Sequence, residues 1–168
     1  MNSTIVVNIA RFIILLLLQV VVFNRIDLFG VADPYPYILF ILLFPVNGNR
    51  ALLLLSAFFI GLFNDMFLNT GGAHAAACVT LAYLRPYIFK ISFGVSYEYQ
   101  TISIAGKLTT ERFSFILTSV VIHHIILYLL EIFRFSLIAD VLIRTLLSTV
   151  LTLIFCIVII HLTKPVKR

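Results

Sequence analysis

The chain has 168 residues, of which 62% are hydrophobic and only 11% are charged, with a mean hydropathy of +1.14 and a net charge of +5. Because about a quarter of the residues of a soluble domain are charged, this composition excludes an ordinary globular enzyme, a disordered chain and a nucleic-acid-binding module. We therefore expect an integral membrane protein, with a single all-α transmembrane domain over residues 1–168 that contacts the lipid bilayer and no nucleic acid.

Long apolar stretches predict the membrane-spanning helices. Crossing a hydrocarbon core of about 30 Å takes about 20 mostly apolar residues. Thr4–Phe23, Phe113–Phe133 and Ala139–Leu162 each have this length. Ala51–Lys90 is long enough for two crossings, with a turn predicted at Phe67–Gly72, where Asn, Thr and two glycines come together. These stretches together predict five helices.

A shorter apolar stretch lies between the first two of these helices. Tyr35–Val46 has only a dozen residues, with Pro36 near its start and Pro45 near its end. It either crosses as a short second helix, which gives a bundle of six transmembrane helices, or re-enters the membrane from one side. Gly94–Arg112 is the main polar stretch and is expected to be the largest loop, with a turn or a strand pair in it.

The basic residues orient these helices, because those in short loops stay on the cytoplasmic side. In the six-helix arrangement, seven basic residues lie on one side and two, Arg25 and Arg134, on the other, which places both termini in the cytoplasm. If Tyr35–Val46 does not cross, eight lie opposite Arg134 alone and the N-terminus faces outward. Both arrangements place the Asn69–Gly72 and Phe135–Ala139 turns outside, so the basic residues do not decide between them.

Charged residues within the spans are costly unless they find a partner, a water-filled cavity or the headgroups. Four of them are expected near the outer end of the bundle, namely Asp65, Glu131, Asp140 and Arg144. Asp140 and Arg144 are four residues apart and share a helix face. The four residues either form one ionic cluster or reach the headgroups separately.

Two arginines are expected in the inner half of the bundle, where no carboxylate lies at the same depth. Arg11 is expected to reach the headgroups by snorkelling or, if it is buried, to find its counter-charge on another chain. Arg85 precedes Pro86, which has no N–H and frees a backbone carbonyl one turn earlier. We expect the helix to end there, with Arg85 at the inner headgroups, rather than to continue with a kink.

The sequence carries no pattern typical of a catalytic, metal or cofactor site. His74, His123 and His124 lack metal-ligand spacing, and hydrogen bonds across helices are expected for them. GxSxG, SxxK and phosphate-binding loops are absent. The small residues of Gly71–Ala77 predict a face on which a neighbouring helix packs closely. We therefore predict a protein that is not an enzyme.

Several motifs follow one another between residues 27 and 90. They are LFG at Leu28–Gly30, PYPYILFILLFP at Pro34–Pro45, GLFNDMF at Gly61–Phe67, NTGGAHAAA at Asn69–Ala77 and AYLRP at Ala82–Pro86. In this order and at this spacing they resemble the MreD family of bacterial rod-shape-determining membrane proteins, as its versions of G-x-x-x-D, G-x-H-A and R-P. The family residues that carry over are Gly61, Asp65, Gly72, His74 and Arg85, without individual chemical roles.

The resemblance implies a six-helix protein of the bacterial inner membrane with both termini in the cytoplasm. It also implies a fold similar to the substrate-binding subunits of energy-coupling-factor transporters and a role in lateral cell-wall synthesis. Such proteins associate with MreC, a partner with one membrane span and a periplasmic domain. They thereby connect the MreB filament to RodA and a class B penicillin-binding protein.

Two functions from different classes follow. The first is a non-enzymatic scaffold whose lateral grooves and outer turns hold the transmembrane helix of a partner. The second is a solute-binding membrane subunit of a transporter, which rests on similarity of fold alone. That second function needs an outward-facing pocket lined by Asp65, Glu131, Arg144 and aromatic residues.

Overall fold

The computed structural model describes residues 2–28, 30–94 and 108–163, and its regular elements within these ranges are helices. Leu28 and Ala32 also form an isolated antiparallel β-bridge. In chain order the helices are α1 (Asn2–Val21), η1 (Phe23–Arg25), η2 (Pro36–Ile38), α2 (Leu39–Leu43), α3 (Arg50–Leu68), α4 (Ala73–Phe93), α5 (Thr110–Ile132), η4 (Phe135–Leu137) and α6 (Ile138–Leu162).

Four segments of the described chain are long and apolar enough to cross a membrane as helices, which supports the expected helical membrane bundle. They are Ile5–Arg25, Arg50–Leu68, Thr110–Ile132 and Ile138–Leu162. The turn expected at Phe67–Gly72 is confirmed, because α3 ends at Leu68 and α4 begins at Ala73. The turn or strand pair expected within Gly94–Arg112 lies outside the described residues, apart from the start of α5 at Thr110.

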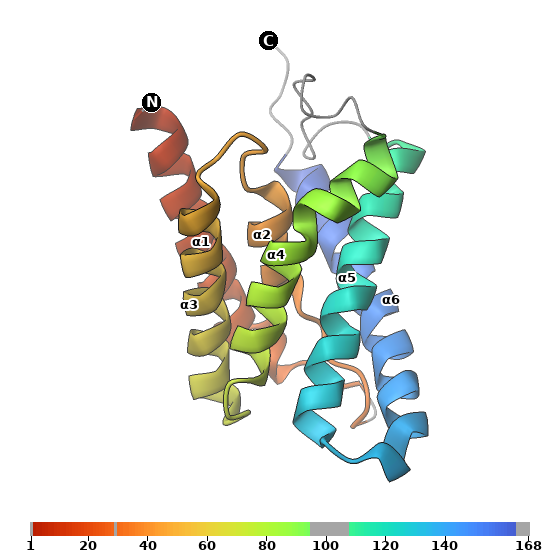
Figure 1. Cartoon of the computed structure of the whole chain (residues 1–168). Coiled ribbons are helices and arrows are strands. Elements are labelled where there is room, and N and C mark those ends of the chain that lie inside the picture. The colour runs from red at the N-terminus through yellow and green to blue at the C-terminus, as the bar shows by residue number, and fades with distance from the viewer. Residues whose placement is uncertain (1, 29, 95–107, 164–168) are drawn as a thin grey trace.

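The long helices run along the bundle in alternating directions (Figure 1). Helices α1, α3 and α5 run in one direction. The segment that contains α2, and helices α4 and α6, run in the opposite direction. The start of α1 and the end of α6 therefore lie together, at what we call the terminal end of the bundle. The turns that join α3 to α4 (residues 69–72) and α5 to α6 (residues 133–137) lie at the opposite end, which we call the hairpin end.

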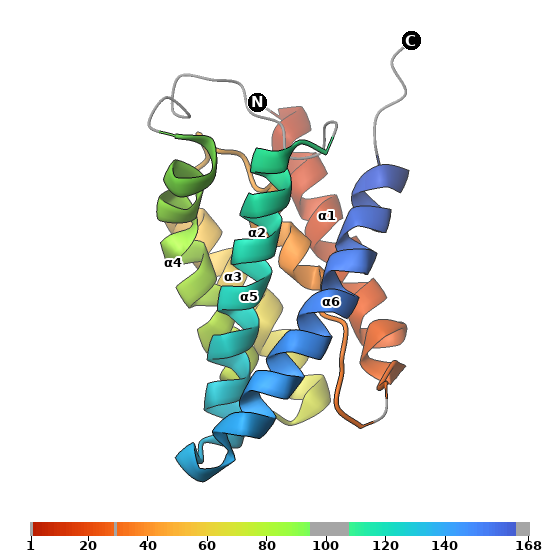
Figure 2. The same ribbon diagram turned by 90° about the vertical axis from the view of Figure 1, so that its right-hand side faces the viewer.

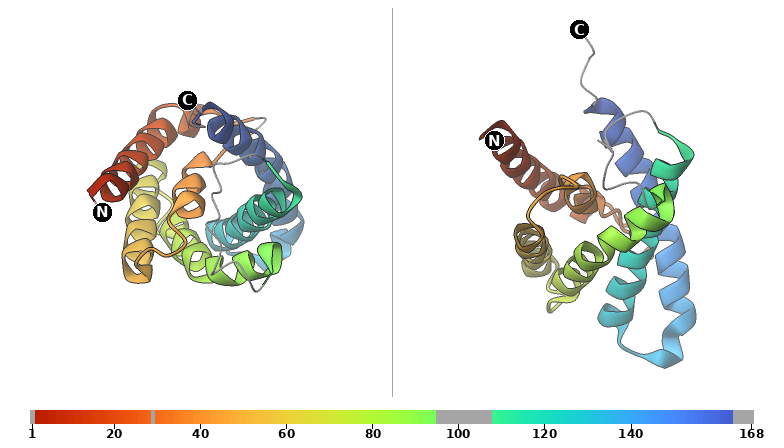
Figure 3. Two further views of the ribbon diagram at one scale, coloured as in Figure 1. Left: turned by 90° about the horizontal axis from the view of Figure 1, so that it is seen from above. Right: turned by 45° about the horizontal axis from the view of Figure 1, so that its top comes forward.

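The segment that contains α2 passes through the middle of the bundle. It runs from the hairpin end to the terminal end, first as extended chain and a 3-10 turn and then as the five-residue helix α2 (Figure 2). Seen from above, α2 lies inside the ring of longer helices (Figure 3). Tyr37, Leu39 and Leu42 are all 0% exposed. Tyr35–Val46 therefore runs along the bundle in one direction, and η2 and α2 cover eight of its twelve residues. It is not among the four segments that are long and apolar enough to span a membrane as helices.

The expectation that α4 ends at Arg85 is wrong. The helix continues through Pro86 and ends at Phe93. Pro86 removes one backbone hydrogen bond, but the turns after it bury Ile88 and Phe89. The Phe89 ring lies 4.2 Å from the ring of Phe115 on α5, measured between centroids. Packing of this last part of α4 against α5 offsets the lost hydrogen bond.

Helices α3 and α4 approach each other most closely at Gly61. A Cβ atom placed on Gly61 would lie 2.5 Å from the Cα atom of Ala75 and 2.6 Å from the carbonyl oxygen of His74. Real Cβ atoms do not approach backbone this closely, so residue 61 has to be glycine for the hairpin to keep its geometry. The packing face expected over Gly71–Ala77 is thus confirmed, and its partner is α3.

Gly61→Ala should therefore separate α3 from α4. We expect a loss of about 1–3 kcal/mol in the free energy of unfolding, as for other additions of bulk to a packed contact. Thermal unfolding of the purified protein in detergent measures this loss. Ala51→Val, which also adds bulk to α3 but at an exposed position, is the matched control. Equal melting temperatures for the two variants would contradict the close contact at Gly61.

Candidate functional site

The carboxylate of Asp65 caps the start of α4. Its Oδ1 atom accepts hydrogen bonds from the backbone N–H of His74 at 2.9 Å and from the hydroxyl of Thr70, and its Oδ2 atom accepts from the N–H of Ala75 at 2.9 Å. The first N–H groups of a helix have no partner within the helix and carry partial positive charge. Asp65 lies one turn after Gly61, where α3 and α4 are in close contact. Its carboxylate therefore provides both the hydrogen-bond acceptors and the negative charge that the start of α4 requires.

The turn before this cap also depends on a glycine. Gly72 has φ of +99° and directly precedes α4, and its carbonyl oxygen accepts the hydrogen bond of Ala76 at 3.0 Å. No atom lies within 4 Å of a Cβ placed there, so space does not select the residue. Glycine is favoured here by the left-handed backbone conformation, which residues other than glycine rarely adopt.

Arg11 and Arg85 both bind the C-terminal end of α2. Arg11 donates from Nη1 to the carbonyl oxygen of Leu43 at 2.9 Å. Arg85 donates from Nη2 to the carbonyl oxygens of Leu42, at 3.3 Å, and of Phe44. The last carbonyls of a helix lack partners within the helix and carry partial negative charge. Two cations from α1 and α4 therefore satisfy carbonyls that the bundle buries.

This arrangement corrects the expectation for Arg85 and shows the partners of Arg11. Arg85 is buried, at 5% exposed, and does not reach the inner headgroups. Its guanidinium also lies 4.9 Å from the centre of the Phe89 ring, one turn further along α4. Arg11 is half-buried and binds within its own chain, because the carbonyl of Leu43 and the side chain of Asn8 both accept from it. A counter-charge on another chain stays a prediction.

The extended chain that leads into α2 is held by polar side chains of α1 and α6. The hydroxyls of Ser148 and Thr152 accept from the backbone N–H groups of Asp33 and Tyr35, at 3.1 and 3.0 Å. Gln19 donates to the carbonyl oxygen of Pro34 at 3.0 Å, and its Oε1 atom accepts from the N–H of Tyr37 at 3.4 Å. Non-helical backbone is tolerated inside a membrane protein only when its polar groups are satisfied within the protein.

A network of tyrosine and histidine side chains joins η2 to α4 and α5. The Tyr37 hydroxyl lies 2.8 Å from Nδ1 of His74 and 3.0 Å from Nε2 of His123. A hydroxyl has one proton to donate, so one of the two histidines accepts from Tyr37 and the other donates to it. His124, the neighbour of His123, contacts Thr152 of α6 through Nε2 at 3.3 Å. The expectation of hydrogen bonds across helices is confirmed for all three histidines.

Charged side chains gather around a cavity at the hairpin end. Its volume is about 500 Å³ and its walls are Val31, Glu131, Ile132, Leu137, Asp140, Ile143 and Arg144. Arg144 donates from Nη2 to the carbonyl oxygen of Gly30 at 3.2 Å, which fixes the turn beside the cavity. Burial raises the pKa of the nearby Asp33 carboxyl, Asp27 adds to this rise, and Arg144 opposes it.

Of the four charged residues for which an ionic cluster was one of two alternatives, three lie together at this end. Glu131, Asp140 and Arg144 line one cavity, and Asp65 does not belong to it. Asp65 is 5% exposed and its two carboxylate oxygens are engaged by the start of α4. Among the side chains that the structure describes, none of those that line the cavity is aromatic, in contrast to the pocket that a solute-binding function requires.

Sequence reasoning found the arginines, Asp65, the glycines and the histidines, but it missed Gln19, Tyr37, Ser148 and Thr152. A weak signal for the last two was present. Thr145, Ser148, Thr149 and Thr152 recur at intervals of three and four residues on an otherwise apolar helix, and all four are buried. Such a polar stripe indicates a helix face that satisfies the polar groups of its neighbours.

The polar residues of this network lie in the interior of the bundle. The side chains of Tyr37, His74, His123 and His124 are all 0% exposed. Within the described residues, no three side chains of histidine, cysteine, aspartate or glutamate lie together as a metal site would require. The network therefore holds the helices together.

Comparison of this chain with models of protein families, with curated proteins and with solved structures finds no match.

Removal of the Asp65 carboxylate should weaken the start of α4. In Asp65→Ala the N–H groups of His74 and Ala75 lose their acceptor, and a buried unpaired group costs about 1–3 kcal/mol. We expect a lower melting temperature in detergent and faster hydrogen exchange at these two amides. Asp65→Asn keeps one oxygen acceptor, so its melting temperature should lie between those of the wild-type protein and Asp65→Ala. Asp27→Ala, an exposed aspartate, serves as control, and unchanged exchange at His74 would rule out the cap.

Tyr37→Phe should destabilise the core without changing its volume much. The substitution leaves Nδ1 of His74 and Nε2 of His123 without the hydroxyl, at an expected cost of about 1–3 kcal/mol. Tyr87→Phe makes the same change at an exposed position of α4 and should be nearly neutral. Unfolding by heat in detergent compares the two variants, and equal stability would show that the Tyr37 hydroxyl does not bind the histidines.

Proposed function

We propose that the chain is a non-enzymatic scaffold of the bacterial cell-elongation complex, as its resemblance to the MreD family implies. In this function it binds MreC in the inner membrane and helps to couple the MreB cytoskeleton to peptidoglycan synthesis by RodA and a class B penicillin-binding protein. No cofactor takes part.

One observation carries the proposal. The motif residues that suggested the family, although separated along the sequence, form a single structural unit. Gly61 admits the start of α4, Asp65 caps it, and Gly72 provides its turn. His74 binds Tyr37 of the PYPY segment, and Arg85 binds the end of that same segment. Because these residues act together on one part of the structure, their joint presence supports a fold shared with the MreD family over a chance match of short motifs.

The orientation belongs to the same proposal. The terminal end of the bundle faces the cytoplasm and the hairpin end faces outward, because this places most of the basic residues inside. Both termini are then cytoplasmic and the protein crosses the membrane several times. The cavity of Glu131, Asp140 and Arg144 then opens on the side where a periplasmic domain of MreC stands.

The contact with the partner is placed at this cavity and the turn beside it. Asp140 and Glu131 are exposed and Arg144 is half-buried, so they are available to charges on another protein. Complementary charges steer association and set the register of an interface, while like charges oppose it. Asp65 and Arg85, in contrast, act inside the bundle and influence the partner only through the fold.

Reversal of the cavity charges should separate binding from folding. In cells that produce both proteins, we expect Glu131→Lys combined with Asp140→Lys, both at exposed positions, to reduce recovery of MreC with this chain about tenfold, while the melting temperature in detergent changes little. Arg25→Gln changes an exposed charge at the hairpin end, outside the cavity, and should leave recovery unchanged.

Asp65→Ala and Arg85→Ala should also lower the recovery of MreC, but only in proportion to the folded protein that is lost. Full recovery of MreC with the charge-reversed protein and with both of these variants would overturn the proposed interaction.

A solute-binding subunit is the second candidate function, and the cavity of about 500 Å³ at the hairpin end is the observation in its favour. Ligand sites of small molecules typically have about this volume. Melting of the purified protein with a panel of vitamins tests it. Stabilisation by one vitamin, lost in Arg144→Gln, would favour this function over the scaffold.

A further inference from the structure

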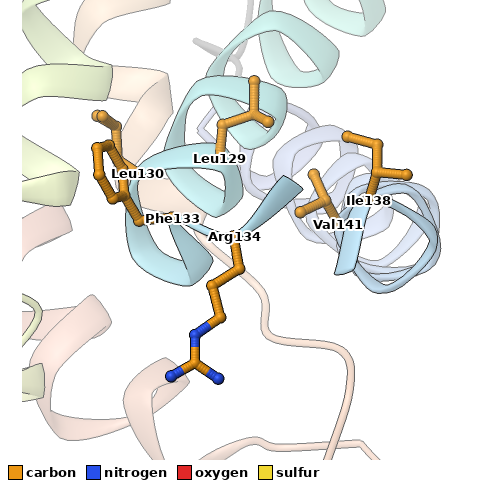
Figure 4. Close-up of a pocket in the computed structure, with 6 residues that line it drawn as sticks. All are labelled: Leu129, Leu130, Phe133, Arg134, Ile138 and Val141. Atoms are coloured by element: carbon orange, nitrogen blue, oxygen red, sulfur yellow. The ribbon is translucent and has the colours of Figure 1, made fainter. Parts of the chain in front are cut away.

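A groove between α5 and α6 has a different character from the charged cavity. Its volume is about 210 Å³ and six residues line it, as Figure 4 shows: Leu129, Leu130, Phe133, Arg134, Ile138 and Val141. Five of the six are apolar. The groove lies beside the turn that joins the two helices, so it opens at the hairpin end of the bundle, where a membrane changes from hydrocarbon to headgroups.

The single charged residue of the groove stands at its outer edge. In Figure 4 the side chain of Arg134 extends away from the apolar residues, past the end of α5. Among the residues that the structure describes, none forms a hydrogen bond or an ion pair with its guanidinium. Glu131, the nearest acid along the chain, lines the charged cavity instead. Arg134 is therefore a cation at the headgroup level without an anion of its own.

Phe133 lies next to Arg134, and its side chain is exposed at the edge of the groove. It ends α5 in the left-handed conformation, with φ of +43°, and its side chain is 82% exposed. A bulky residue at positive φ is strained, and such strain concentrates at binding and switch regions. The N–H of Phe133 binds the carbonyl oxygen of Leu129 at 3.1 Å, and the conformation leaves the aromatic side chain exposed at the edge of the groove.

The chemistry of the groove selects its occupant. An apolar channel of this size takes a hydrocarbon chain, whereas a transmembrane helix with its side chains is about 10–12 Å across. An arginine binds a phosphate through parallel charge-assisted hydrogen bonds. A molecule with an acyl chain and an anionic phosphate at its end meets both features. We propose that the α5–α6 groove binds one anionic phospholipid, with an acyl chain along Leu130 and Val141 and the headgroup phosphate on Arg134.

This inference does not rest on the proposed function, because a bound lipid is compatible with a scaffold and with a solute-binding subunit alike. Its basis is the combination of an unpaired cation, an apolar groove and a strained, exposed aromatic residue at one place in the fold.

Photocrosslinking with a phosphatidylglycerol that carries a diazirine in its acyl chain tests the site. The full-length protein is reconstituted in phosphatidylcholine vesicles with a small fraction of this probe, irradiated and mapped by mass spectrometry. The exposed face of α1, which includes Ile13, Ile14 and Leu17, reports labelling by bulk lipid. We expect the groove residues to be labelled at least threefold more than this face.

Three variants keep the test decisive. Arg134→Gln should lower the excess labelling of the groove at least threefold, and Arg134→Lys should retain most of it. Val141→Trp should fill the groove and remove the excess, while labelling of α1 stays constant and shows that the protein is folded.

Three outcomes would overturn the proposal. They are equal labelling of the groove and of α1, labelling of the groove that does not respond to Arg134→Gln, and a photoreactive residue at position 138 that captures a second copy or another protein in place of lipid.

Discussion

Backbone that is not helical, when it is buried among membrane helices, has to find partners for every N–H and C=O group within the protein. The central segment around α2 imposes this constraint on the whole bundle. Ser148 and Thr152 of α6 and Gln19 of α1 serve its extended part, and Arg11 and Arg85 serve the end of α2. Polar residues that would be costly in an apolar helix are thus kept because the central segment needs them.

The α3–α4 hairpin is coupled to the same segment. Gly61 and Asp65 set the position of α4, and this places His74 within hydrogen-bond distance of Tyr37. Tyr37 in turn contacts His123 of α5. The hydroxyl of Tyr37 thus links α4 to α5, in addition to the direct packing of Phe89 on Phe115. The polar core acts as a unit, because an unpaired buried group is far more costly in a low-dielectric interior than in water.

Two features of the surface share the α5–α6 turn. Glu131, Asp140 and Arg144 face a charged cavity, whereas Leu130, Phe133 and Arg134 face an apolar groove. The long helices otherwise present apolar side chains, as lipid contact requires. The proposed partner and the proposed lipid would therefore bind on different faces of one turn, and each would hold the end of α5 and the start of α6 in place.

The sequence by itself determined that the chain is a helical membrane bundle and placed the turn between α3 and α4, because hydropathy over about 20 residues and a cluster of Asn, Thr and Gly act locally. Of the five spanning helices that it predicted, four are long and apolar enough to cross a membrane, and α4 is not among these four. The sequence also singled out Gly61, Asp65, His74 and Arg85. Their partners were decided only by the tertiary structure. Tyr37 lies 86 residues from His123 and Arg11 lies 32 residues from Leu43 along the chain, and no local pattern indicates which distant groups will meet. The continuation of α4 past Pro86 was decided in the same way, because the packing of Phe89 on Phe115 outweighs a backbone hydrogen bond that the sequence shows to be missing.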